Sequence, residues 1–138
     1  MSSRSQSFHF PYKKLRTDIG VTPYPFVQVQ ILKDGKTVNS DFLVDTGADV
    51  ATLPSYMAQE LGIDLHKLGR SKSQGVGEGL VDTWETKIKI RIRDVEFKIR
   101  CTFVASNKIP PLLGKLDFFS EFNLYFDNER EELRLDRR

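Results

Sequence analysis

The stretch from Phe42 to Pro54, FLVDTGADVATLP, contains residues whose types and order suggest acid–base chemistry. An apolar run ends at Asp45, and Thr46 and Gly47 follow before the chain becomes apolar again. A carboxylate held at the end of a strand can exchange protons with a bound substrate. The same residues also suit a purely structural turn, because an aspartate side chain accepts local backbone hydrogen bonds and glycine frees the backbone. Both interpretations stay open on this stretch alone.

The other reactive side chains give little support to a different chemistry. His9 and His66 stand apart, without metal-ligand spacing and without a nucleophile beside them, which favours surface histidines. Cys101, the single cysteine, falls in an apolar alternation, so we expect a buried and unreactive thiol. The sequence has no Walker-type phosphate loop and no Gly-x-Ser-x-Gly elbow. We therefore expect neither a metal nor a cofactor.

The glycine-rich segment from Gln74 to Gly79, QGVGEG, looks like a phosphate-binding loop only superficially. A dinucleotide loop follows a strand and opens a helix, whereas this segment leads into LVDTWETKIKIRI, which alternates like a strand. Glycines at a hairpin tip let the backbone approach a ligand closely. The segment is therefore predicted to be a flap over a cleft.

Apolar and polar residues alternate along most of the chain, which predicts strands. A strand after Pro25 should turn at Asp34-Gly35, a dipeptide suited to the positive φ angles of a type I′ turn, and should return through Thr37 to Val44. Asp45 then stands at the end of a strand. Two further hairpins are predicted, one from residues 84–92 and 95–103, the other from residues 123–126 and 132–135.

Two short helices complete the predicted elements. The segment PSYMAQELG, residues 54–62, has Pro54 in its first turn, Met57 and Leu61 four positions apart, and Gly62 just past its end. The second helix is expected from Lys115 to Phe119. The elements together predict an all-β, antiparallel domain with two short helices.

Length and composition limit the function classes. The 138 residues fit one domain, and 21 Lys plus Arg against 19 Asp plus Glu leave a net charge of +2, too small to direct the chain to nucleic acid or an anionic membrane. No signal peptide and no apolar run of membrane-spanning length occurs, so we expect a soluble, cytoplasmic protein. Residues 1–24 are polar, basic and rich in turn residues, and we expect them to form an arm, with order beginning near Phe26 and the domain covering residues 25–138.

Three motifs in a fixed order carry a resemblance to a known family. FLVDTGADVATLP is followed about thirty positions later by SQGVGEG, and near the end by PPLLGKLDFF. In this combination the chain resembles the retropepsin-like aspartic proteases from about Phe26 to Leu135, and it is similar to the protease domain of DNA-damage-inducible proteins and to small bacterial retropepsin-like proteins. The resemblance implies a closed β barrel with short helices and a C-terminal hairpin. It also implies a Leu-Leu-Gly turn that crosses behind the catalytic loop.

The resemblance also implies a mechanism. Aspartic proteases use two carboxylates that share one proton, one activating water as a base while the other donates to the scissile carbonyl. This sequence has one Asp-Thr-Gly, so a two-fold homodimer would pair Asp45 with its own copy. By resemblance, Thr46 would hydrogen-bond across the axis and the Gly47 amide would face the carboxylates. The residues from Asn123 to Leu135 would supply strands to the dimer sheet.

Substrate-binding roles follow from the same resemblance. Ala48 carries no hydroxyl to donate to the carboxylate pair, and fewer donors stabilise the charged form less, so we expect activity nearer neutral pH. Asp49 would accept a substrate backbone amide, and the alternative for this residue is a solvated acid of the loop. Relatives often show Gly-Arg where this chain has Gly114-Lys115. Because lysine offers a point charge and no bidentate fork, we expect its pairing with Asp49 to be weaker or differently arranged.

The flap would act as a cover. By resemblance, Val76 lies at its tip and closes over the substrate, with Gly75 and Gly77 as hinges, and closure would expel water from the carboxylates.

These observations predict a homodimeric aspartic endopeptidase that cleaves extended or unfolded polypeptides, with no nucleic-acid or membrane partner. The alternative is a non-catalytic dimeric module on the same fold that binds peptides or mediates assembly. A phosphatase with an aspartate nucleophile is disfavoured, because that chemistry needs a second aspartate two positions on, where Gly47 stands.

Overall fold

The structure is a computed structural model that describes residues 6–75 and 79–138. The helices are α1 (Tyr56–Glu60), the 3-10 turn η1 (Leu65–Lys67) and α2 (Phe118–Glu121). The strands are β1 (Ser7–Pro11), β2 (Lys13–Thr17), β3 (Gly20–Tyr24), β4 (Phe26–Lys33), β5 (Lys36–Val44), β6 (Ala51–Pro54), β7 (Arg70–Gly75), β8 (Gly79–Ile92), β9 (Val95–Val104), β10 (Leu112–Leu113), β11 (Phe122–Asp127) and β12 (Glu132–Arg137).

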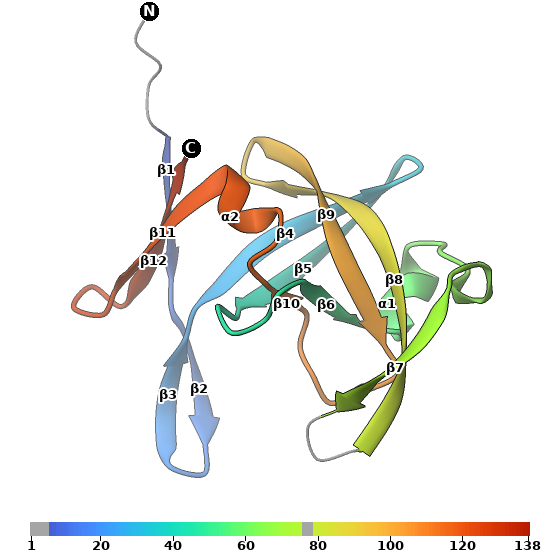
Figure 1. The fold of residues 1–138 in the computed structure, drawn as a ribbon. Helices are drawn as coiled ribbons and strands as arrows, with labels where there is room; N and C mark the ends of the chain where they lie inside the picture. The colour runs from blue at the N-terminus through green and yellow to red at the C-terminus, as the bar shows by residue number, and fades with distance from the viewer. Residues whose placement is uncertain (1–5, 76–78) are drawn as a thin grey trace, which may run out of the picture.

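The main sheet closes on itself as a ring. Its strand order is β4-β5-β10-β6-β9-β8-β7, and β4 also pairs with β8, which closes the ring and leaves β7 outside it (Figure 1). The expectation of a purely antiparallel domain is wrong in two places, because β10 runs parallel to β5 and β6 runs parallel to β9. Both parallel partners are short and far apart along the chain, so no hairpin signal could reveal them.

The hairpin of β4 and β5 carries the candidate aspartate and forms as predicted. Asp34 and Gly35 adopt φ angles of 49° and 79°, the positive values that a type I′ turn requires. Val27, Val29 and Ile31 are buried on one side of β4, which accounts for the period of two. The hairpin therefore delivers Val44 and Asp45 to one edge of the core.

β8 covers the strand expected in LVDTWETKIKIRI, residues 80–92, and it pairs with two different partners. Its second half, from Thr83 to Ile92, pairs with β9 as expected. Its first half, from Gly79, pairs with β7 to make a second hairpin that extends from the ring (Figure 1). Gln74 pairs with Leu80 and Gly75 with Gly79 at the end of this hairpin, and the rest of the glycine-rich segment, residues 76–78, lies outside the described residues.

A separate three-stranded sheet, in the order β1-β12-β11, joins the two ends of the chain. The C-terminal hairpin of β11 and β12 is confirmed. The expectation that order begins near Phe26 is wrong, because β1 pairs along β12 and the Phe10 side chain is buried. The Arg93 guanidinium lies 4.4 Å from the centre of the Phe10 ring, and Arg93 also donates to the His9 carbonyl at 3.0 Å. The sequence signal for β1 was the alternation in FHF, which is too short to outweigh the polar residues around it. The predicted boundary between an arm, residues 1–24, and a domain, residues 25–138, stays a prediction.

The helices form near their predicted places with different ends. Pro54 belongs to β6 and Ser55 precedes the first turn, so α1 is shorter than the predicted segment, while Gly62 has a φ of 71° just past its end. α2 begins later than expected, because the Asp117 carboxylate accepts the Arg100 backbone N–H at 2.7 Å and holds the preceding chain out of the helix. Within the described residues, no helix has the length and apolar character needed to cross a membrane.

Replacing Phe10 by alanine tests whether the N-terminal strand is part of the folded core. Loss of a buried phenylalanine leaves a cavity and should lower the free energy of unfolding by about 3 kcal/mol. The measurement is urea unfolding at a fixed protein concentration. Leu80→Ala, at a side chain that is 67% exposed, is the control and should change the midpoint little. Equal effects of the two substitutions would show that β1 is not packed on the core.

Candidate active site

Asp45 is held at the end of β5 by hydrogen bonds on both sides of that strand. The Val44 N–H donates to the Pro25 carbonyl at 3.0 Å, and the Asp45 N–H donates to the Leu113 carbonyl at 2.9 Å. One partner precedes β4 and the other ends β10, so the ring itself fixes the backbone of Asp45. A carboxylate on a strand end of a rigid sheet is positioned better than one on a free loop.

The loop after Asp45 folds back on its carboxylate. The Gly47 N–H donates to Asp45 Oδ1 at 2.9 Å, and the Ala48 N–H donates to the Asp45 carbonyl at 3.1 Å. Asp45 Oδ2 accepts no hydrogen bond from any residue that the structure describes. Asp45 is half-buried and Thr46 is exposed. Asp45 Oδ1 is therefore held by the loop, and Asp45 Oδ2 can accept a hydrogen bond from a bound molecule.

β10 crosses between β5 and β6, directly behind this loop. Leu112 pairs with Leu43 on one side and with Thr52 on the other. A Cβ atom at Gly114 would lie 2.5 Å from the Val50 carbonyl oxygen and 2.8 Å from the Ala48 carbonyl oxygen. Only glycine fits such a close approach of two backbones. The expected Leu-Leu-Gly crossing thus has a direct steric reason.

The chain after Gly114 continues along the loop and brings Asp49 and Lys115 together. The Lys115 N–H donates to the Ala48 carbonyl at 2.9 Å, and the Leu116 N–H donates to the Asp49 carbonyl at 2.7 Å. Lys115 Nζ lies 3.3 Å from Asp49 Oδ1, within one chain, and the two side chains are 44% and 82% exposed. An ion pair this exposed contributes little to stability. The backbone hydrogen bonds, more than the ion pair, hold this side of the loop.

The structure places the expected site residues in two groups. Asp45 to Asp49 share one loop. The flap residue Gly75 ends β7 and pairs with Gly79, and Val76 and Gly77 lie outside the described residues. The backbone of Gly79, with a φ of 75°, turns into β8.

A depression of about 410 Å³ beside Thr46 was not anticipated as part of the site. The C-terminal hairpin of β11 and β12, which we call the terminal hairpin, forms its other side together with α2. Its lining residues are Thr46, Phe119, Phe122, Asn123, Leu124, Phe126 and Arg138. The aromatic residues in DFFSEFNLYF were the sequence signal for this apolar depression. The sequence does not show whether such aromatic side chains are buried in the core or exposed at the edge of a sheet, because both give the same pattern. The exposed Thr46 therefore lies next to an apolar edge strand.

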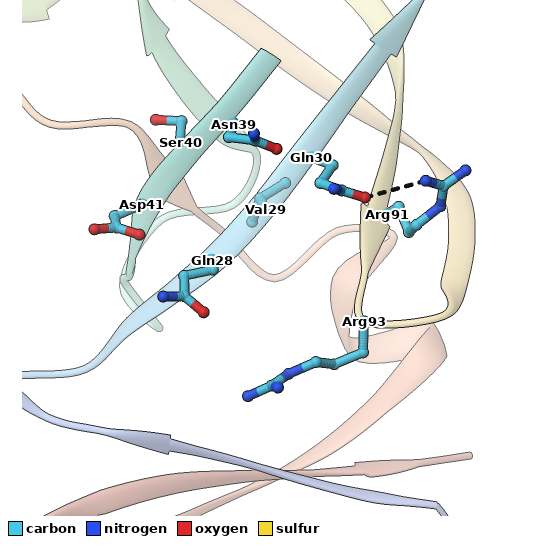
Figure 2. Close-up of a pocket in the computed structure, with 8 residues that line it drawn as sticks. All are labelled: Gln28, Val29, Gln30, Asn39, Ser40, Asp41, Arg91 and Arg93. Carbon is cyan, nitrogen blue, oxygen red and sulfur yellow. Dashed lines mark hydrogen bonds between the residues drawn. The ribbon is translucent and has the colours of Figure 1, made fainter. Parts of the chain in front are cut away.

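The larger hollow, about 520 Å³, lies elsewhere, on the outer side of β4, β5 and β8 (Figure 2). Its lining residues are Gln28, Val29, Gln30, Asn39, Ser40, Asp41, Arg91 and Arg93. Arg91 donates to the Gln30 side chain at 3.1 Å, and its guanidinium also pairs with Glu96. Its polar groups pair partly with one another, and none of the predicted site residues lines this hollow.

The other reactive side chains lie apart from the Asp45 loop. His9 and His66 are both exposed, and His9 Nδ1 lies 3.0 Å from Glu132 Oε1. Cys101 is buried in β9, and burial raises the pKa of its thiol to about 12. Within residues 6–75 and 79–138, no three His, Cys, Asp or Glu side chains are grouped to hold a metal ion.

Comparison with known proteins agrees with this geometry. The family described as "gag-polyprotein putative aspartyl protease" matches residues 27–121, which include the Asp45 loop, the β7–β8 hairpin and the Gly114 crossing. No curated protein sequence matches the chain significantly.

Two solved structures extend the comparison. A retropepsin-like aspartic protease from Rickettsia conorii superposes with a TM-score of 0.70 at 22% sequence identity, covering 99% of this chain and 95% of that one. EIAV protease complexed with the inhibitor HBY-793 matches with a TM-score of 0.45 at 27% identity, covering 67% of this chain and 82% of that one. The first match confirms the expected retropepsin-like fold, and its coverage includes the N-terminal strands.

Substituting Gly114 by alanine tests the crossing. Because the new Cβ would overlap two backbone carbonyl groups, we expect the free energy of unfolding to fall by about 2 kcal/mol or more. Gly69→Ala is the matched control, since nothing lies within 4 Å of its Cβ position. Urea unfolding curves of both variants give the comparison, and an equally small effect at the two positions would contradict the close approach.

The buried thiol predicts a pH dependence of stability. Because the pKa of Cys101 is raised from 9.0 to about 12 in the folded chain, the unfolded chain ionises first as the pH rises. The thiol therefore contributes a loss of stability from about pH 9 upward, and below that pH it contributes none. Unfolding free energies of the wild type and Cys101→Val between pH 7 and 10.5 measure this difference. Parallel curves for the two proteins would show that the thiol titrates normally.

Proposed function

The chain belongs to the gag-polyprotein putative aspartyl protease family, and from this premise we propose that it is a homodimeric aspartic endopeptidase in which Asp45 of each copy acts on one water molecule. The single observation that carries the proposal is the anchored Asp45 carboxylate, with Oδ1 bonded to the Gly47 N–H and Oδ2 left open. This arrangement suits a group that must exchange protons with a ligand.

A second carboxylate must come from another copy. The sequence has one Asp-Thr-Gly, and the other acid in the same loop, Asp49, points to Lys115. A residue on a two-fold axis meets its own copy across the interface. Thr46, exposed beside Asp45, is the residue that would then reach across the axis.

The edge strand β11 supports this arrangement. It is the last strand of its sheet and therefore presents unpaired backbone groups that another strand can use. Tyr125 and Phe126 on β11 are 52% and 39% exposed, and Phe119 next to it is 36% exposed. The depression between Thr46 and this strand places the apolar surface beside the candidate catalytic loop.

The proposed chemistry balances with two carboxylates and one proton between them. The ionised carboxylate takes a proton from water as the water oxygen bonds to the scissile carbonyl carbon, and the protonated one donates to the carbonyl oxygen. Collapse of the resulting diol breaks the carbon–nitrogen bond: the amine leaves with the proton that came from water, and a diol hydroxyl returns its proton to the other carboxylate, which restores the shared proton. No metal is needed for either step.

The substrate is proposed to be an extended polypeptide that lies between the Asp45 loop and the flap. Ala48 and Asp49 would line the floor, with the end of the β7–β8 hairpin at Gly75 above, while the predicted Val76 and Gly77 lie outside the described residues. An extended chain can satisfy its backbone groups against strand edges, which the β7–β8 hairpin supplies.

The substitution Asp45→Asn tests the proposal. Removing the ionisable group should reduce cleavage of an unfolded protein by about 10³-fold, since positioned acid–base groups contribute on that order. Cleavage is measured between pH 4 and 7, and sedimentation reports the dimer in the same samples. Asp34→Asn is the control, because it makes the same chemical change in a turn that accepts asparagine.

The possible results separate the two readings of the fold. A dimeric Asp45→Asn protein without cleavage supports the shared carboxylates. Undiminished cleavage by this variant contradicts them. A wild-type dimer that cleaves nothing between pH 4 and 7 would favour the non-catalytic peptide-binding module.

A further inference from the structure

The hairpin of β2 and β3, residues 13–24, exposes apolar side chains that no neighbour covers fully. Among the described strands, β2 and β3 pair only with each other. Ile19 is 91% exposed, Val21 62% and Leu15 36%. An isolated two-stranded hairpin is at best marginally stable in water, so a surface that packs against this one would stabilise it. We call residues 13–24 the N-terminal hairpin.

The N-terminal hairpin begins close to the end of β5, the strand that leads into Asp45. Only Pro25 separates β3 from β4, and Phe26 at the start of β4 pairs with Leu43, two residues before Asp45. The five residues of β3 span about 16 Å at about 3.3 Å each. Figure 1 shows this hairpin and the β7–β8 hairpin both reaching toward the lower edge of the view, beyond the end of β5.

Hydrogen bonds and ion pairs fix the base of the N-terminal hairpin. The Tyr12 N–H donates to the Glu131 carbonyl at 2.8 Å, and the Tyr12 hydroxyl donates to Asn128 Oδ1 at 2.9 Å. Lys14 Nζ lies 2.9 Å from Glu131 Oε2, and Lys13 Nζ lies 3.7 Å from Asp41 Oδ2. These contacts join the base to the β11–β12 turn on one side and to β5 on the other.

The N-terminal hairpin and the terminal hairpin therefore form one continuous surface. A groove of about 500 Å³ lies between them, lined by Tyr12, Lys14, Val21, Pro23, Asn128 and Glu131. Val21 and Pro23 share the face of β3 that looks into this groove, and Arg16 pairs with Val21 in the hairpin register. Arg16 is exposed.

The area that a dimer needs favours a second copy of this chain as the partner. The six-residue edge of β11 is about 20 Å long, and a strip about 10 Å wide along it covers about 200 Å². A stable interface buries about 800 Å² on each partner. The β11 edge alone is therefore too small, and across the groove the N-terminal hairpin adds three large exposed apolar side chains, Leu15, Ile19 and Val21.

We propose that the N-terminal hairpin packs Ile19 and Val21 against a second copy of this chain, beside the loop that carries Asp45. This inference rests on the homodimer of the proposed function and adds the residues that stabilise it. Each copy would then hold the other through its own N-terminal hairpin, and the two Asp45 loops would be brought together from both sides.

The double variant Ile19→Ser/Val21→Ser tests the contact. Its two side chains are exposed within one chain, so the fold should survive, while the dissociation constant of the dimer should rise at least tenfold. Sedimentation equilibrium over a range of concentrations measures this constant, and circular dichroism reports the fold. Tyr56→Ser, at a side chain that is 49% exposed on α1, is the matched control and should leave the constant unchanged.

Cross-linking identifies what the tip touches. Ile19→Cys adds one accessible thiol to a chain whose natural cysteine is buried, so benzophenone maleimide should label position 19 alone. Illumination should then give cross-links between two chains, located by mass spectrometry.

The results discriminate between this inference and the proposed function. Interchain cross-links together with a weakened double variant support the contact. A wild-type dimer without such cross-links, and a double variant that dimerises as tightly, would overturn the contact and leave the proposed function standing. Cross-links formed only to an added unfolded polypeptide would overturn it in favour of a substrate contact. A wild type that is monomeric at every concentration would remove the homodimer itself, and this inference with it.

Discussion

The close crossing of two backbones at Gly114 is the constraint on which the Asp45 site depends. A Cβ atom there would lie 2.5 Å from the Val50 carbonyl oxygen, so the loop and the crossing strand can approach only because this side chain is absent. The same approach lets the Lys115 and Leu116 amides bond to the loop carbonyls. Backbone contacts of this kind do not depend on salt or pH, unlike the exposed ion pair of Asp49 and Lys115. The sheet thus positions the Asp45 carboxylate, and the proposed chemistry depends on the second carboxylate and the substrate that would bind beside it.

In the proposed dimer the Asp45 site would be half of a symmetric whole, so the hollow of about 520 Å³ in a single chain need not coincide with it. The hollow in Figure 2 is built from polar side chains of β4, β5 and β8 that partly bond to one another, as Arg91 does with Gln30. The depression near Thr46 is smaller, and three phenylalanines line it, a residue type that is enriched at protein interfaces. In the proposed dimer, the cleft would form between two copies, so a single chain shows only one of its walls.

The two ends of the chain contribute to this surface together. β1 pairs along β12, and Ser7 Oγ donates to Asp136 Oδ1 at 2.7 Å, a hydrogen bond that holds the pKa of Asp136 below its usual range with further help from Arg134. Phe8 packs edge-on against Phe122, with ring centres 6.3 Å apart. The terminal sheet therefore forms without strands from another chain, and it leaves β11 as an exposed edge. This division suits a chain that folds first and associates afterwards, as the proposed dimer requires.

The sequence by itself determined the local elements and the identity of the candidate acid. Alternation predicted the hairpins, Asp34-Gly35 predicted its turn, and the ordered motifs around Asp45 and Gly114 indicated the family, because each signal lies within a few neighbouring residues. The parallel pairs of β5 with β10 and of β6 with β9, the docking of β1 on β12, and the apolar depression beside Thr46 came only from the tertiary structure. Those features depend on contacts between segments about 50 to 130 positions apart, for which the short periods of strands and helices carry no information. Local periodicity decides which face of a strand is apolar, and the packing of the whole chain decides what that face meets.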